Sequence, residues 1–137
     1  MREHRDSLIA AGEIRSSSRT RLVPDQTIAT PFRHSIDTLL VAGCPNAAEM
    51  SPSTTVTNSL REVAAATRRY GSVCSGAFFL AAAGLLHGKR VTTHWAVASR
   101  LAQAYPSVSV DADTLRRAFV RHVGVTPAEY RKSYEPS

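Results

Sequence analysis

The chain has no long apolar run. Across its 137 residues, no stretch reaches the roughly 18 to 20 consecutive apolar residues that a membrane-spanning helix requires. The opening stretch, MREHRDSLIAAGEIR, mixes acids with bases and holds only a short apolar segment, so it does not match a secretory signal. We therefore expect a globular, cytoplasmic protein with no membrane partner.

Cysteine is scarce as well. The chain holds only Cys44 and Cys74, and without a secretory signal both are expected to be reduced thiols. Histidines are scattered, and none of the following stands at metal-ligand spacing with a cysteine: His34, His87, His94 and His122. The sequence therefore predicts neither zinc nor another metal, and no cofactor is expected.

Acidic residues are outnumbered, since 11 Asp and Glu face 17 Lys and Arg for a formal net charge of +6. Such an excess points to an anionic partner, and nucleic acid is the first candidate. The excess is concentrated near the C-terminal end, in Arg116, Arg117, Arg121, Arg131 and Lys132. The alternative, a modestly basic domain that binds nothing acidic, stays open.

Short extended segments alternate with helical periods along the chain. Strands are expected at residues 7–11, 20–24, 36–42, 70–73, 90–93 and 107–110, and helices at 57–70, 75–86, 95–105 and 112–123. The segment 36–42 is apolar and bounded by Gly43, which fits a buried parallel strand. Strands separated by helices of about a dozen residues predict an α/β fold with a mainly parallel sheet.

Two of the expected helices carry clear end signals. Ser75–Leu86 is so apolar all round that it must be covered on most sides, and Gly88 is expected to end it. Near the C-terminal end, Gly124 ends one helix, and Thr126 as N-cap with Glu129 three residues later opens the next. Two helices joined by a glycine-containing turn are expected there.

Cys74 stands at the sharp join between a short apolar strand and the Ala-rich helix. A thiol at a helix N-terminus lies at the positive end of the peptide dipoles, which favours its thiolate. At such an elbow the nucleophile is exposed, and the next backbone N–H, that of Ser75, points into the same pocket to hold an oxyanion. Gly76 lets the helix pack closely on the strands. The alternative is a buried structural cysteine at a packed strand–helix join.

Three segments follow one another in order: RTRLVPDQTIA, IDTLLVAG and RRYGSVCSGAFFLAAAGLLHGKRVTTHW. Together they resemble the PfpI/ThiJ-like (class I glutamine amidotransferase-like) domain, in the version that forms the N-terminal sensor half of many AraC/XylS-family regulators. The later segments TLRRAF and GVTPAEYR resemble the last part of the AraC-type DNA-binding domain. The resemblance divides the chain into a partial sensor domain, residues 7–111, and a partial helix-turn-helix, residues 112–137.

This resemblance implies an incomplete flavodoxin-like, mainly parallel sheet with flanking helices, followed by a short helix-turn-helix remnant. A small-molecule effector would bind in a pocket at Gly43, Cys44, Cys74 and Ser75. DNA would contact the last part of the chain at Thr114, Arg116, Arg117 and Arg121. Because a single helix pair makes few contacts, and because Asp113 repels phosphate, DNA binding is expected to be weak and strongly salt-dependent.

The chain also departs from the family pattern. The strand and helix that usually supply a glutamate beside the elbow cysteine have no counterpart in MREHRDSLIAAGEIR. Gly43-Cys44 replaces a family-typical Gly-Gly, and Arg19 stands where a turn glycine is usual. Later strands and most helices of the DNA-binding module have no counterpart either. We interpret the chain as an internally deleted or remodelled regulator, or a gene remnant; a compact autonomous design is the alternative.

Missing strands have a physical consequence. They leave sheet edges unpaired and take away part of the cover of the helix expected at 75–86. We therefore expect a chain that is marginally stable, or that pairs with a second copy as a homodimer to hide the apolar surface.

Catalysis is the alternative to regulation. Cys74 would be the nucleophile and His94 the base, at the end of a strand that faces the same crevice. His94 could instead cap the helix that follows it. Because the acidic partner is missing, the sequence favours a DNA-binding transcriptional regulator with a small-molecule sensor domain over a PfpI/ThiJ-like hydrolase, hydratase or glyoxalase-like enzyme.

Overall fold

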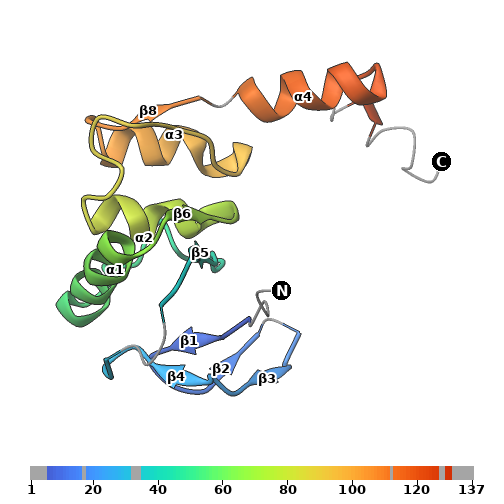
Figure 1. Cartoon of the computed structure of the whole chain (residues 1–137). Coiled ribbons are helices and arrows are strands. Elements are labelled where there is room, and N and C mark those ends of the chain that lie inside the picture. The colour runs from blue at the N-terminus through green and yellow to red at the C-terminus, as the bar shows by residue number, and fades with distance from the viewer. Residues whose placement is uncertain (1–5, 17, 32–34, 112, 127–128, 131–137) are drawn as a thin grey trace.

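The computed structural model describes residues 6–16, 18–31, 35–111, 113–126 and 129–130. The strands are β1 (Ile9–Ala10), β2 (Ile14–Arg15), β3 (Arg21–Leu22), β4 (Gln26–Thr27), β5 (Thr38–Val41), β6 (Arg69–Ser72), β7 (Arg90–Val91) and β8 (Ser109–Val110). The helices are α1 (Thr54–Ala66), α2 (Ala77–Ala82), α3 (Trp95–Ala104) and α4 (Asp113–Val123), and a short 3-10 turn covers Cys74–Gly76. The predicted α/β fold is confirmed (Figure 1).

The strands pair in short units. Parallel pairs join β1 to β4, β5 to β6 and β7 to β8, whereas β2 and β3 form an antiparallel hairpin. The predicted parallel arrangement is therefore confirmed, but within the described residues the strands form separate pairs instead of one sheet. Most of these strands are only two residues long, which leaves little backbone to bond a second neighbour.

The predicted burial of the strand at 36–42 is wrong. Along β5 the side chains of Thr38 and Leu40 are exposed and those of Leu39 and Val41 are half-buried. Leu40 keeps 63% of its surface exposed. Because α2 packs on β5 and side chains alternate between the faces of a strand, this alternation is that of a strand covered on one face.

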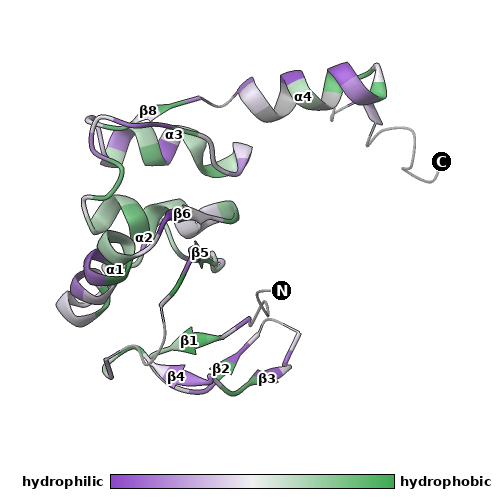
Figure 2. Cartoon of the chain, in the orientation of Figure 1, coloured by the Kyte–Doolittle hydropathy of each residue, from purple (hydrophilic) through white to green (hydrophobic). Residues whose placement is uncertain are grey.

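The core gathers around α2. It consists of Ala47, Ala77, Phe78, Leu80, Ala81, Leu86, Leu101 and Val108. α2 packs against α1, β5 and β6, so the most apolar helix is covered as the sequence requires. Figure 2 shows α2 in the hydrophobic colours, whereas α1 and α4 carry hydrophilic stretches.

α2 is shorter than predicted. It ends at Ala82 because Gly84, at φ +75°, reverses the chain: the Gly84 N–H donates to Ala81 O (2.9 Å) and the Leu85 N–H to Leu80 O (3.0 Å). The Tyr70 hydroxyl donates to Leu85 O (3.0 Å) and holds this turn against β6. The predicted stop at Gly88 was therefore one turn too late.

α1 begins and ends earlier than predicted. Ser53 caps it, because its Oγ accepts the Val56 N–H (3.4 Å). At the other end, the Arg68 and Arg69 N–H groups both donate to Asp37 O (3.1 Å) and start β6. The Arg68 guanidinium bonds the Asp37 carboxylate (2.7 Å) and, with the Thr38 hydroxyl, holds the pKa of that carboxyl well below its usual range.

The turn between β2 and β3 contains Arg19 at φ +65°. This is the left-handed region that favours glycine, and the sequence places an arginine where a turn glycine is usual. The Arg19 N–H donates to Ser16 O (2.9 Å), and Arg21 pairs with Glu13 (3.1 Å) across the hairpin. The turn is thus held by its own hydrogen bonds despite the unfavourable residue.

Figure 1 shows β1–β4 at one end of the molecule and α4 extending outward beyond β8 at the other. α4 ends at Gly124, which has φ +84° and donates its N–H to Val120 O (2.9 Å). The predicted capping box follows: Glu129 Oε2 accepts the Thr126 N–H (2.8 Å), and Thr126 Oγ1 accepts the Glu129 N–H (3.2 Å). Arg131 and Lys132 lie outside the described residues, and the helix-turn-helix identity stays a prediction.

Gly76 offers a direct test of the packing between α2 and β5. A β-carbon at Gly76 would overlap Val41 O and lie 3.0 Å from Ala42 C. We expect Gly76→Ala to lower the free energy of unfolding by about 1 to 3 kcal/mol, the usual cost of overpacking, measured by urea denaturation. The control is Gly71→Ala on β6, where an added β-carbon meets nothing within 4 Å. Equal effects of the two variants would contradict the close approach.

Candidate functional site

A pocket of about 380 Å³ lies beside Cys74. It is lined by Gly43, Cys44, Pro45, Cys74, Ser75, His94 and Val97. The structure therefore brings together the four residues that the sequence placed at the effector pocket, and His94, which the sequence placed at the same crevice, lies beside them at the start of α3. Their roles in binding or catalysis stay predictions.

Cys74 lies at a strained turn between β6 and α2. Its φ is +54°, a left-handed conformation that is costly for a residue with a β-carbon, and its side chain is exposed. Two hydrogen bonds hold the turn: the Val73 N–H donates to Val41 O (3.0 Å), and the buried Thr93 hydroxyl donates to Cys74 O (2.7 Å). An exposed thiol on a strained strand-to-helix turn has the geometry of a nucleophile elbow.

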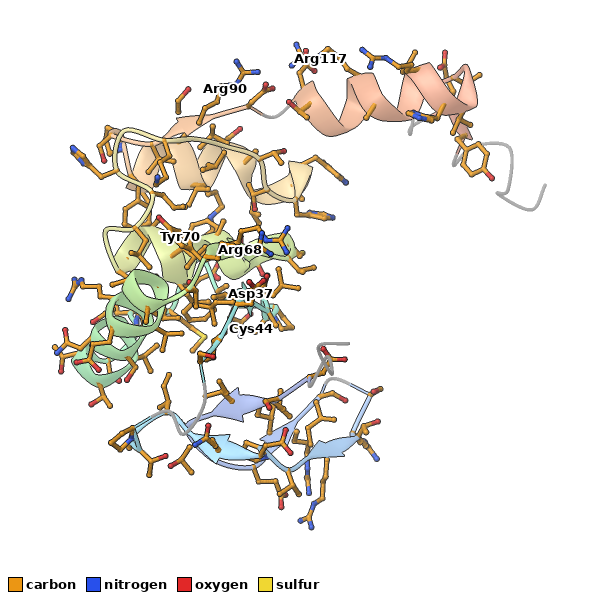
Figure 3. The ribbon with its side chains drawn as sticks, in the orientation of Figure 1. Asp37, Cys44, Arg68, Tyr70, Arg90 and Arg117 are labelled. Carbon is orange, nitrogen blue, oxygen red and sulfur yellow. The ribbon has the colours of Figure 1, made fainter. Side chains whose placement is uncertain are left out.

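The segment at Gly43 and Cys44 closes over this elbow. A β-carbon at Gly43 would overlap Ser75 Oγ and lie 2.8 Å from the backbone N atoms of Ser75 and Gly76. The Ser75 hydroxyl donates to Cys44 O (2.9 Å). The Cys44 thiol lies near Met50 Sδ (3.4 Å), in the middle of the molecule (Figure 3). Position 43 therefore has room only for glycine. It lies against the backbone N of Ser75, the expected oxyanion donor.

His94 caps α3, as one of the two sequence interpretations held. Its Nδ1 accepts the Ala96 N–H (3.3 Å), and its ring lies 5.4 Å from that of Trp95. A neutral imidazole that accepts through Nδ1 carries its hydrogen on Nε2, so it has no lone pair left for a thiol proton. None of the described residues that line the pocket is acidic. The acceptor nitrogen of His94 is therefore already engaged, and no carboxylate among these lining residues lies beside the Cys74 thiol.

The residues predicted to contact DNA divide into three groups. Thr114 and Arg117 both bond Asp111: the Thr114 hydroxyl donates to its Oδ2 (2.7 Å), and Arg117 Nη2 to the same oxygen (3.0 Å). Arg121 is exposed on α4. The side chain of Arg116 lies outside what the structure describes. Two of the four residues predicted to contact DNA are therefore already bonded to Asp111 of the same chain.

Asp111 is the residue that sequence reasoning missed. Its Oδ1 accepts the N–H groups of Asp113 (3.0 Å) and Thr114 (3.1 Å), and its Oδ2 also pairs with Arg90 of β7 (3.2 Å). The Thr114 hydroxyl, the Asp113 N–H and the two arginines lower the pKa of the Asp111 carboxyl. Figure 3 shows Arg90 and Arg117 near the join between β8 and α4. An aspartate two residues before a helix is a capping signal that could have revealed it.

Within the described ranges, no three His, Cys, Asp or Glu side chains lie close enough together to hold a metal ion. None of the described helices has both the length and the apolar character needed to cross a membrane.

A family model, described as the DJ-1/PfpI family, matches residues 5–128. The chain belongs to the DJ-1/PfpI family. The fold agrees with a solved member, a THiJ/PfpI family protein from Pseudomonas syringae, at a TM-score of 0.60 and 21% identity, over 96% of this chain and 63% of that one. The match of the family model to this DJ-1/PfpI chain continues past residue 111, the end of the sensor domain that the sequence resemblance implies.

Proteins with quite different names are similar in sequence to parts of this DJ-1/PfpI chain. An uncharacterized protein in the cpoL 5′ region of Streptomyces lividans is 42% identical over 77% of this chain and 74% of its own length. Isonitrile hydratase of Pseudomonas putida is 41% identical over 44% of the chain, and the HTH-type transcriptional regulator GlxA of Rhizobium meliloti 43% over 37%. These matches cover only 27% of the hydratase and 16% of the regulator.

The strained φ at Cys74 predicts an unusual response to glycine. We expect Cys74→Gly to be more stable than Cys74→Ala by about 1 kcal/mol, because glycine adopts a positive φ without a β-carbon clash. The free energies of unfolding are compared by urea denaturation. At Cys44, which lacks a positive φ, the order should be reversed, with Cys44→Ala more stable than Cys44→Gly. If Cys74→Ala is as stable as Cys74→Gly or more stable, Cys74 is not strained.

Proposed function

We propose that this chain is a DNA-binding transcriptional regulator of the AraC/XylS type, with a small-molecule pocket at Cys74 and a DNA-contacting helix in α4. The observation that carries the proposal is the end of the chain: α4, its stop at Gly124 and the capping box of Thr126 and Glu129. The likeness to a regulator named as HTH-type supports it. The division into residues 7–111 and 112–137 belongs to the same proposal.

The effector would be a small molecule that binds in the pocket between Gly43 and α3. Val97 offers an apolar wall and His94 a ring N–H, with Cys74 at the rim. A ligand there contacts the first turns of α3, and α3 packs on β8, which leads into α4. Binding could in this way change the position of the DNA-contacting helix.

Pairing with a second copy is part of the proposal. Large apolar side chains are exposed at Leu40, Val73 and Trp95, with 63%, 52% and 59% of their surfaces accessible. A second copy could cover some of them, and two copies would double the contacts of an otherwise short DNA-binding segment.

The DNA-binding proposal is tested with Arg121→Ala. We expect the full chain to bind a fluorescently labelled mixed-sequence duplex at low salt. Because Arg121 is exposed on α4, its removal should weaken binding and make the slope of log K against log salt shallower by about 0.9, the contribution of one phosphate contact. Anisotropy titrations over a series of salt concentrations measure both quantities.

The matched control is Arg21→Ala, which removes the same charge from β3. It should leave the salt slope unchanged. If the wild type does not bind, or if both variants weaken binding equally, α4 is not a DNA-contacting helix.

A second function is favoured by one observation, the φ of +54° that exposes Cys74 at its elbow. With the likeness to isonitrile hydratase, it supports a cysteine-dependent hydratase that adds water to an isonitrile carbon to give a formamide. His94 weighs against this function, because its Nδ1 already accepts the Ala96 N–H.

The hydratase is tested by incubating the full chain with an alkyl isonitrile and measuring the formamide by mass spectrometry. If the enzyme interpretation holds, Cys74→Ser abolishes turnover and Cys44→Ser, at the other pocket thiol, leaves most of it. Product formation that is the same in both variants and in buffer would rule it out. A chain that neither turns over substrate nor binds DNA would fit the gene-remnant interpretation.

A further inference from the structure

One oxygen of the Asp111 carboxylate pairs with two arginines that come from different elements. Arg90 Nη2 of β7 lies 3.2 Å and Arg117 Nη2 of α4 lies 3.0 Å from Asp111 Oδ2. The Asp111 side chain is only 17% exposed, whereas those of Arg90 and Arg117 are 73% and 55% exposed. The carboxylate thus lies beneath two accessible guanidinium groups.

These residues border an open hollow of about 440 Å³. Its lining is Arg90, Ser109, Val110, Asp111, Asp113 and Arg117. Arg117 of α4 lines the hollow together with Arg90 of β7. A DNA backbone that lies along α4 would therefore also come near Arg90. Arg90 was not among the DNA-contacting residues that the sequence indicated.

We propose that Arg90 and Arg117 together form a phosphate-contacting surface for DNA, and that Asp111 is an internal competitor that weakens it. The inference rests on the proposed DNA-binding function and adds to it a residue outside α4 and a built-in restraint on affinity.

The competition follows from the chemistry of the groups. A carboxylate oxygen and a phosphate oxygen are both anionic acceptors for a guanidinium, so each arginine must share or give up its bond to Asp111 when it meets DNA. Ion pairs between exposed side chains are weak, so phosphate can displace them. The negative charge of Asp111 also repels the DNA backbone directly.

The chain contains a matched arrangement elsewhere. Asp37 pairs with Arg68 (2.7 Å) and Arg69 (3.5 Å) at the β5–β6 end, in the middle of the molecule and away from α4 (Figure 3). Neutralising Asp37 raises the net charge by one unit, as neutralising Asp111 does, and it also releases two arginines. These two arginines do not lie on the proposed surface. It therefore separates a local effect from an effect of net charge.

The experiment compares Asp111→Asn, Asp37→Asn and the wild-type chain on the same mixed-sequence duplex. Asparagine caps helices about as well as aspartate, so α4 should be retained, which circular dichroism checks. We expect Asp111→Asn to bind several-fold more tightly and to steepen the salt slope by up to about 1.8, as two further phosphate contacts would. Adding Arg90→Ala to Asp111→Asn should remove about 0.9 of that gain.

The outcomes separate the two proposals. If the wild type binds and Asp111→Asn changes nothing, or if Asp37→Asn has the same effect, Asp111 is not a competitor, although the DNA-binding function stands. An unchanged slope on adding Arg90→Ala removes Arg90 from the surface. If none of the three chains binds at low salt, both the inference and the proposed function fail.

Discussion

The site depends on the close approach of two chain segments at Gly43 and Gly76. The α-carbon of Gly76 lies so near Val41 O that a β-carbon would overlap it, and the same holds for Gly43 against Ser75 Oγ. These contacts bring α2 down onto β5 and place the loop at Gly43 over the elbow. Without them, neither the pocket nor the orientation of Cys74 would exist. The lack of room for a β-carbon at Gly43 and Gly76, rather than any ion pair, is therefore the constraint on which the site depends.

The elbow stores strain that the surrounding hydrogen bonds must offset. Cys74 keeps φ at +54° while Val41 O and the Thr93 hydroxyl hold the residues on either side of its turn. Yet His94 uses its acceptor nitrogen to cap α3, and no acidic side chain lines the described pocket. Under the proposed functions, a strained exposed thiol with no free base beside it suits contact with a ligand better than proton transfer.

Features set by a few neighbouring residues were predictable. The elbow, the close packing at Gly76, the His94 cap and the Thr126–Glu129 capping box each need only local sequence, and the structure has all of them. Features that depend on distant neighbours were not. The exposure of Leu40 depends on whether anything covers the second face of β5, and the pairing of Asp111 with Arg90 joins residues 21 positions apart. The early end of α2 is different, because Gly84 was a readable signal that the later Gly88 obscured.

α3 is the physical link between the pocket and α4. Its first turns carry His94 and Val97 into the pocket, and Leu101, fully buried, anchors it in the core. It packs on β8, whose end at Asp111 is bound to β7, since the Asp111 N–H donates to Val91 O (2.8 Å). Under the proposed function, a ligand that tilts α3 would act on β8, and through β8 on the carboxylate that holds Arg90 and Arg117. Asp111 lies where such a movement could change the number of arginines that face DNA, so the sensing and DNA-contacting proposals meet at one side chain.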